Sequence, residues 1–148
     1  MFYIILILAA IFTMPAKAET LGIKIEGIYQ LNLAKSTVGP GFSKSITLNF
    51  VGDQFVAVGI GADDKPYTVT YTFIVDGKPH PVTGAPRYDT STYTALDSYA
   101  FSISRAAKDG KVVETGIGII DPISKTLTHT SIGPDGSYKR LLVFEKQQ

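Results

Sequence analysis

Two histidines, His80 and His129, are the side chains of this sequence best suited to acid–base or metal chemistry. His80 lies between Pro79 and Pro81, a pattern typical of a solvent-exposed turn. His129 alternates with Leu127 in a threonine-rich run, so we expect its side chain to point inward. There it could act as a polar lining residue, while one histidine alone makes no metal site.

No pattern in the chain completes a metal or catalytic site. No carboxylate has the spacing that would add a ligand to His129. Asp63-Asp64 precedes Lys65-Pro66, which is typical of a polar turn rather than of a calcium loop. The chain has no cysteine, which excludes disulfides, thiolate metal sites and a cysteine nucleophile, and it has no Gly-x-Ser-x-Gly motif. We therefore expect no catalytic residues, no metal ligands and no cofactor.

Two Gly-x-Gly triplets, at residues 59–61 and 116–118, raise the question of a phosphate-binding loop. Neither opens a helical pattern, which such a loop requires. Glycines inside strands are typical of a bend or a β-bulge, and this is the structure that we expect at both places.

Aromatic side chains are the remaining candidates for a binding site, since the chain has 8 Tyr and 8 Phe. Binding pockets typically combine apolar walls with a few hydroxyl groups. The residues that could line such a pocket for a small apolar ligand are Tyr71, Phe73, Tyr93, Tyr99, Phe101 and His129. The same rings could instead simply fill the core.

Short β-strands must position these side chains. Asp-Gly pairs at residues 76–77, 109–110 and 135–136 are strong hairpin signals, because both central residues of a type I′ turn need a positive φ. Between the turns, runs rich in Thr, Tyr, Phe, Val and Ile predict strands. The expected strands are Glu26–Leu33, Lys44–Val51, Gln54–Ile60, Tyr67–Val75, Thr90–Leu96, Tyr99–Ala106, Val112–Ile120, Thr126–Ile132 and Tyr138–Glu145, with a further short one at His80–Val82.

The number and spacing of these strands predict an all-β fold. We expect an antiparallel meander β-barrel of about 8–10 strands, with a β-sandwich as the alternative. The segment 96–107 fits a helical stripe as well as a strand, and we interpret it as a strand because Asp109-Gly110 follows at once.

The N-terminal segment has the pattern of a signal peptide. Phe2–Thr13 is almost entirely apolar but shorter than the roughly 20 residues that span a bilayer. It leads to Ala16-Lys17-Ala18, a small-x-small step that a signal peptidase accepts. We expect residues 1–18 to be a signal peptide and residues 19–148 to be one periplasmic or secreted domain beginning at Glu19. A membrane anchor or a buried N-terminal strand is the alternative.

Charge gives no indication of a polyanionic partner. Of the 14 Lys and Arg, cleavage removes only Lys17, which leaves 13 basic and 13 acidic residues. We therefore expect neither nucleic acid nor an anionic membrane as a partner. We also expect no membrane-integral segment after cleavage, and no lipid anchor because cysteine is absent.

Several short motifs carry a resemblance to a known group. Gly27-Ile28-Tyr29 is followed by Leu31-Asn32, Lys35-Ser36 and Pro40-Gly41, and later by the stretches 76–86 and 109–113. This pattern resembles small secreted lipocalin-like (calycin-type) proteins of bacteria. The resemblance implies a barrel in which Tyr29 takes the place of a first-strand Trp, with Lys139 or Arg140 packing on its ring. It implies no enzymatic activity.

Three functions remain open at this stage. The leading hypothesis is an exported, non-catalytic protein that carries or senses a small hydrophobic ligand inside the barrel. The second is a protein-interaction or inhibitor-type envelope module with a filled core. The third is a barrel enzyme, an isomerase or hydrolase that uses His129.

Overall fold

The computed structural model describes residues 22–148, so the predicted signal peptide lies outside the described residues. The described chain is built almost entirely from strands joined by short turns, with one 3-10 turn, η1 (Leu33–Lys35). The ten strands are β1 (Gly27–Leu31), β2 (Ser45–Val51), β3 (Gln54–Ile60), β4 (Pro66–Thr72), β5 (Asp76–Thr83), β6 (Thr90–Ala95), β7 (Ala100–Ala106), β8 (Val112–Asp121), β9 (Thr126–Ile132) and β10 (Lys139–Lys146).

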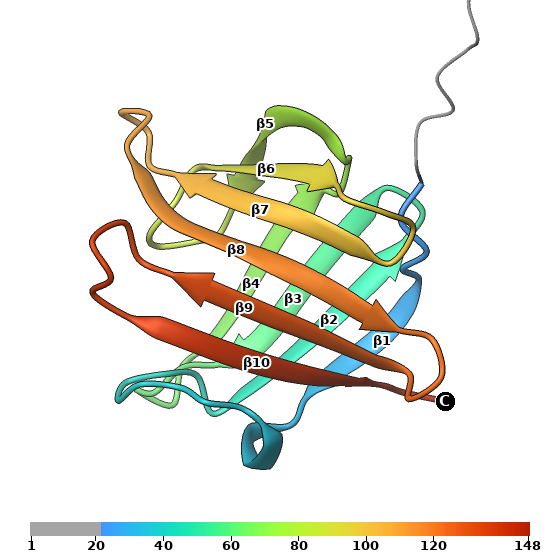
Figure 1. The fold of residues 1–148 in the computed structure, drawn as a ribbon. Helices are drawn as coiled ribbons and strands as arrows, with labels where there is room; N and C mark the ends of the chain where they lie inside the picture. Colours follow the sequence, from blue (N-terminus) through green and yellow to red (C-terminus); the bar gives the residue numbers. More distant parts are fainter. Residues whose placement is uncertain (1–21) are drawn as a thin grey trace, which may run out of the picture.

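The strands form one closed antiparallel barrel (Figure 1). Each strand pairs with its neighbours in sequence, and β1 pairs with β10 to close the sheet. Closure gives every strand of residues 22–148 a partner on both sides, although β4 and β5 pair at two positions only. The predicted all-β meander barrel is confirmed, and the sandwich alternative is wrong. Among residues 22–148, no helix is long and apolar enough to cross a bilayer.

The least expected strand is β5, which covers eight residues rather than a short stretch around His80. It begins at Asp76-Gly77, so the hairpin turn expected at these two residues is wrong. His80 lies in this strand, as the expected short strand His80–Val82 implied, and bonds to Asp76 at 2.9 Å. The solvent-exposed turn that its flanking prolines suggested is wrong. Proline removes a ladder donor and is tolerated at irregular or weakly paired strands. Here β5 pairs with β4 at two positions only and has a register shift against β6, which explains how it accommodates Pro79 and Pro81.

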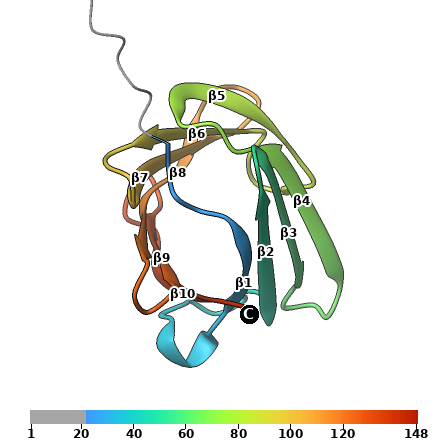
Figure 2. The ribbon, with the colours of Figure 1, turned by 90° about the vertical axis from the view of Figure 1, so that its right-hand side faces the viewer.

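The two ends of the barrel differ. At one end, here called the plugged end, residues 22–26 cross the opening ahead of β1 (Figure 2). The Lys24 N–H donates to the carbonyl of Ser98 at 3.0 Å, and the side chain of Ile25 is buried in the core. At the opposite end, the loop end, lie the long β1–β2 connection and four further turns (Figure 1).

The closing pair of strands corrects the prediction for Tyr29. Its ring is buried in β1 opposite Lys146, whose Nζ lies 5.8 Å from the ring centroid. The predicted cations, Lys139 and Arg140, do not reach it. They lie six or seven residues earlier in β10, and a strand rises roughly 3.3 Å per residue, so they sit about 20 Å away near the loop end.

Aromatic rings fill most of the barrel interior. The ring of Phe50 contacts Phe55 and Phe73, and Phe73 contacts Tyr93 and Phe101. Centroid separations across these contacts run from 4.8 to 5.4 Å, within the range in which aromatic pairs attract. The core is therefore a packed aromatic cluster with little free space.

Candidate functional site

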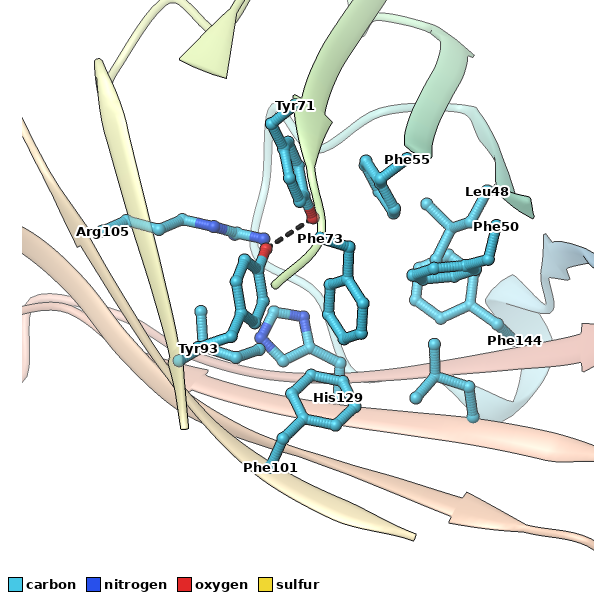
Figure 3. A pocket seen from close by; sticks show the side chains of 12 residues that line it. Leu48, Phe50, Phe55, Tyr71, Phe73, Tyr93, Phe101, Arg105, His129 and Phe144 are labelled. Carbon is cyan, nitrogen blue, oxygen red and sulfur yellow. Dashed lines mark hydrogen bonds between the residues drawn. The ribbon is translucent and has the colours of Figure 1, made fainter. Parts of the chain in front are cut away.

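A small cavity of about 70 Å³ remains inside this aromatic cluster (Figure 3). Four of its lining side chains are polar: Tyr71, Tyr93, Arg105 and His129. The others are apolar, namely Leu48, Phe50, Phe55, Phe73, Phe101, Ile103, Leu127 and Phe144. The cavity thus combines an apolar wall with a few convergent polar groups, the composition typical of a ligand pocket.

The structure brings together five of the six residues predicted to line a pocket. Tyr71, Phe73, Tyr93, Phe101 and His129 all line the cavity. Tyr99 does not. It lies in the β6–β7 turn at the plugged end, where the Nζ of Lys24 is 5.5 Å from its ring centroid, and it lines an open surface groove there.

Two glycines of β8 make room for the lining side chains. Gly116 and Gly118 face inward, and β8 keeps a regular register with β7 and β9 at both positions. The predicted β-bulge is therefore absent at Gly116 and Gly118, and likewise at Gly59. A Cβ on Gly118 would overlap the Phe101 ring, and one on Gly116 would come within 3.1 Å of the His129 Nε2. Both glycines serve close packing of side chains against backbone.

A pair of tyrosine hydroxyls forms part of the polar wall. The Tyr93 hydroxyl donates to the Tyr71 hydroxyl at 2.5 Å, and their rings stack 5.6 Å apart. Burial and the neighbouring Tyr93 raise the pKa of Tyr71 well above its ordinary value, against the opposing charge of Arg105. The Tyr71 hydroxyl thus stays protonated at neutral pH. In Figure 3 the guanidinium of Arg105 extends toward this hydroxyl pair.

Arg105 belongs to a charged network at the loop end. Its Nη1 donates to Oε1 of Glu114, which lies directly opposite it on β8. The other carboxylate oxygen of Glu114 accepts from the Tyr138 hydroxyl at 2.8 Å and from Nη1 of Arg140 at 3.5 Å. Burial alone would raise the pKa of Glu114, but the charge of Arg105 and the bond from Tyr138 hold it below its ordinary value. One carboxylate therefore faces two guanidinium groups.

Strand register explains why these polar side chains meet. Ser91, Arg105 and Glu114 are direct neighbours across β6, β7 and β8. Ser131 is the direct neighbour of Arg140 on β10. Since alternate residues of a strand face the same side, these side chains share the inward face with the aromatic cluster. They form a polar strip across five neighbouring strands, next to the apolar part of the cavity.

His129 is buried between this strip and the aromatic rings, as its alternation predicts. Burial, together with the charge of Arg105, lowers its pKa from 6.5 to about 3. The imidazole is therefore neutral at physiological pH. It adds no positive charge to the network and offers no negative charge to balance it.

Four buried polar atoms have no hydrogen-bond partner within residues 22–148. These atoms are Ser91 Oγ, Arg105 Nε, His129 Nε2 and Ser131 Oγ. More than nine in ten buried polar groups in folded proteins are paired, so an unpaired group needs a reason. Here the four unpaired groups occur together, and two of them belong to side chains that line the cavity.

No known protein-family model, curated protein or solved structure matches this chain. Within residues 22–148, no three potential metal ligands lie close enough to hold an ion. What the cavity offers is an apolar wall beside polar groups: two hydroxyls, an unpaired guanidinium N–H, and an imidazole nitrogen that donates or accepts according to its tautomer.

Sequence reasoning missed the charged members of this site, although a signal was present. Arg105 has the same strand parity as Phe101 and Ile103, and Glu114 has the same parity as Ile120. Charged residues on an otherwise apolar strand face indicate a buried pair, because an unpaired charge inside a protein is strongly disfavoured. The alternation of inward and outward residues therefore predicts that both Arg105 and Glu114 point into the barrel.

Proposed function

We propose that the domain binds a small ligand reversibly in the barrel interior and does not turn it over. The observation that carries the proposal is the cavity itself, in which an apolar wall meets unpaired buried donors. A ligand that contacts both would remove the cost of leaving those donors unpaired, about 1–3 kcal/mol for each group. The signal-peptide pattern of residues 1–18 adds the proposal that binding takes place outside the cytoplasm.

The size of the cavity limits the ligand. One water needs roughly 10–15 Å³ of such space. A cavity of about 70 Å³ therefore accommodates about five non-hydrogen atoms. This is far too small for a fatty acid, and smaller than the engineered cavities of roughly 150 Å³ that bind benzene. A ligand of this size that gains about 0.8 kcal/mol per atom would have a Kd on the order of 1 mM.

The state of His129 supports a binding role over a catalytic one. A general base works best when its pKa lies near the working pH. A pKa of about 3 makes His129 a weak base at neutral pH. No hydrogen bond among the described residues joins it to a hydroxyl that it could activate as a nucleophile.

Binding can be tested by NMR with the protein that begins at Glu19. Small probes of four to six non-hydrogen atoms, both neutral and charged, would be titrated to about 50 mM. We expect at least one probe to show saturable shifts at the resonances of Phe73 and Phe101, together with intermolecular contacts to these rings. Resonances of the outward-facing Thr128 should not shift and serve as the internal control. The absence of any saturable shift at the two rings, for every probe, would contradict the proposal.

The variant Phe73→Ala provides a second readout. Removing this ring should enlarge the cavity and allow benzene to bind, as in engineered cavities of known proteins. The same truncation should lower stability by about 3–5 kcal/mol, since the ring packs against three others. A destabilised variant that still excludes benzene would show that the interior collapses into a solid core.

A further inference from the structure

We propose that the cavity ligand is a short-chain carboxylate, bound through its charged end by Arg105 and through its alkyl end by the aromatic wall. This inference rests on the proposed binding function and specifies the chemical class of the ligand. It follows from three observations: the charge balance of the network, the free donors of Arg105 and the volume of the cavity.

The first observation is an excess of positive charge. Arg105 and Arg140 each carry one positive charge, Glu114 carries one negative charge, and His129 is neutral, so the network has a net charge of +1. Within the part of the chain that the structure describes, Glu114 is the only carboxylate paired with either arginine. The side chains of Arg105, Arg140 and Glu114 are 16%, 22% and 6% exposed, so most of each charged group is shielded from solvent. A single bound anion would neutralise the excess charge.

The second observation is which donors of Arg105 are free. Nη1 of Arg105 donates to Glu114, whereas its Nε is buried without an acceptor. Among the described residues, no hydrogen bond uses its Nη2. In a guanidinium group, Nε–H and one Nη2–H are parallel and match the two oxygens of a carboxylate. The unused edge therefore has the geometry that recognises a planar carboxylate.

The third observation is size. Space for about five non-hydrogen atoms fits a carboxylate with a one- or two-carbon alkyl chain, of which propionate is the larger. Phe73 and Phe101 supply the apolar surface for that chain. The hydroxyl pair of Tyr71 and Tyr93 lies on the same wall as Arg105 and can donate a further hydrogen bond to a carboxylate oxygen.

The test compares propionate with propionamide, which has the same shape but no charge. Both are titrated by NMR into the protein that begins at Glu19, at constant ionic strength. A carboxylate accepts from both parallel donors and carries a negative charge, whereas an amide has one acceptor oxygen and an NH2 group that opposes the second donor. We therefore expect propionate to bind about tenfold more tightly than propionamide or better. Equal affinity of the two at the Phe73 and Phe101 resonances would overturn the carboxylate assignment but leave the binding function in place. Absence of binding by either, and by the wider probe panel, would overturn both.

The variant Arg105→Lys locates the charged contact. Lysine keeps the positive charge beside Glu114 but lacks the parallel donors, so propionate affinity should fall about tenfold while propionamide affinity stays the same. Arg140→Lys is the matched control, because Arg140 contacts the same Glu114 but does not line the cavity. Its propionate affinity should stay within about twofold of the wild type. Propionate binding that is unchanged in Arg105→Lys would place the anion on the protein surface and overturn the proposal. If Arg105→Lys does not fold, the comparison of propionate with propionamide on the wild-type protein decides alone.

Discussion

The buried neutral histidine makes the stability of this domain sensitive to mild acid. In the unfolded chain His129 has an ordinary pKa of 6.5, whereas in the folded domain burial lowers this pKa to about 3. As the pH falls below 6.5, the unfolded state takes up a proton that the native state does not accept until about pH 3. Stability is therefore complete above pH 6.5 and decreases as the pH falls toward 3.

The size of this effect at pH 5.0 follows directly. That pH lies 1.5 units below the ordinary value, and one unit corresponds to about 1.36 kcal/mol, so the free energy of unfolding should fall by about 2 kcal/mol between pH 7.0 and 5.0. Carboxylates with lowered pKa values, such as Glu114, act mainly below pH 4.5 and add little in this interval.

Urea unfolding at pH 7.0 and 5.0 measures this loss. His129→Gln should remove most of the pH dependence, because the group that titrates is gone. The sequence offers a matched control in its other histidine, since His80→Gln leaves His129 intact and should retain the full loss. An equal loss of stability in wild type and His129→Gln would refute the reasoning. So would an imidazole resonance of His129 that titrates between pH 5 and 8.

Three further predictions concern the packing around the cavity, and urea unfolding at pH 7.0 checks each of them. Gly118→Ala should lower the free energy of unfolding by about 1–3 kcal/mol, because the added Cβ overlaps the Phe101 ring. The control Gly39→Ala, which has open space around the added Cβ, should change it by no more than about 0.5 kcal/mol. Equal effects of the two variants would contradict the close packing at Gly118. Glu114→Gln should cost about 3 kcal/mol, because it leaves two guanidinium groups without a counter-charge; a neutral result would mean that both arginines are well solvated. Tyr71→Phe should cost about 1 kcal/mol through loss of the hydroxyl pair, and a stabilised variant would contradict that bond.

The strands could be predicted because local signals determine them. Asp-Gly turns and runs of β-branched and aromatic residues locate nine of the ten strands to within a few residues. β5 was largely missed because Pro79 and Pro81 argue against a strand, and only its weak pairing with β4 tolerates them. The cation on Tyr29 was assigned wrongly for a related reason. It depends on the register between the first and last strands, and no local pattern determines that register.

The candidate site could be predicted in part. Alternation placed Tyr71, Phe73 and His129 correctly on the inward face. It also suggested Tyr99, which the turn before β7 carries away to the plugged end. Whether the inward-facing rings leave a cavity depends on how their shapes fit together across the barrel. The alternation of residues along each strand does not determine that fit.

Stability alone does not account for the charged network beside the cavity. Burying an ion pair costs desolvation that the attraction between the charges often fails to recover, and apolar replacements of similar volume are often as stable or more so. Interior positions of neighbouring strands hold Phe101, Ile103 and Leu142, so this barrel fills such positions with apolar side chains elsewhere. At Arg105 and Glu114 it instead holds two charges, and it leaves the Nε of Arg105 without a partner. Such a donor disfavours the unliganded fold and favours any bound molecule that supplies an acceptor. Its place at the edge of the cavity is therefore better explained by binding than by folding.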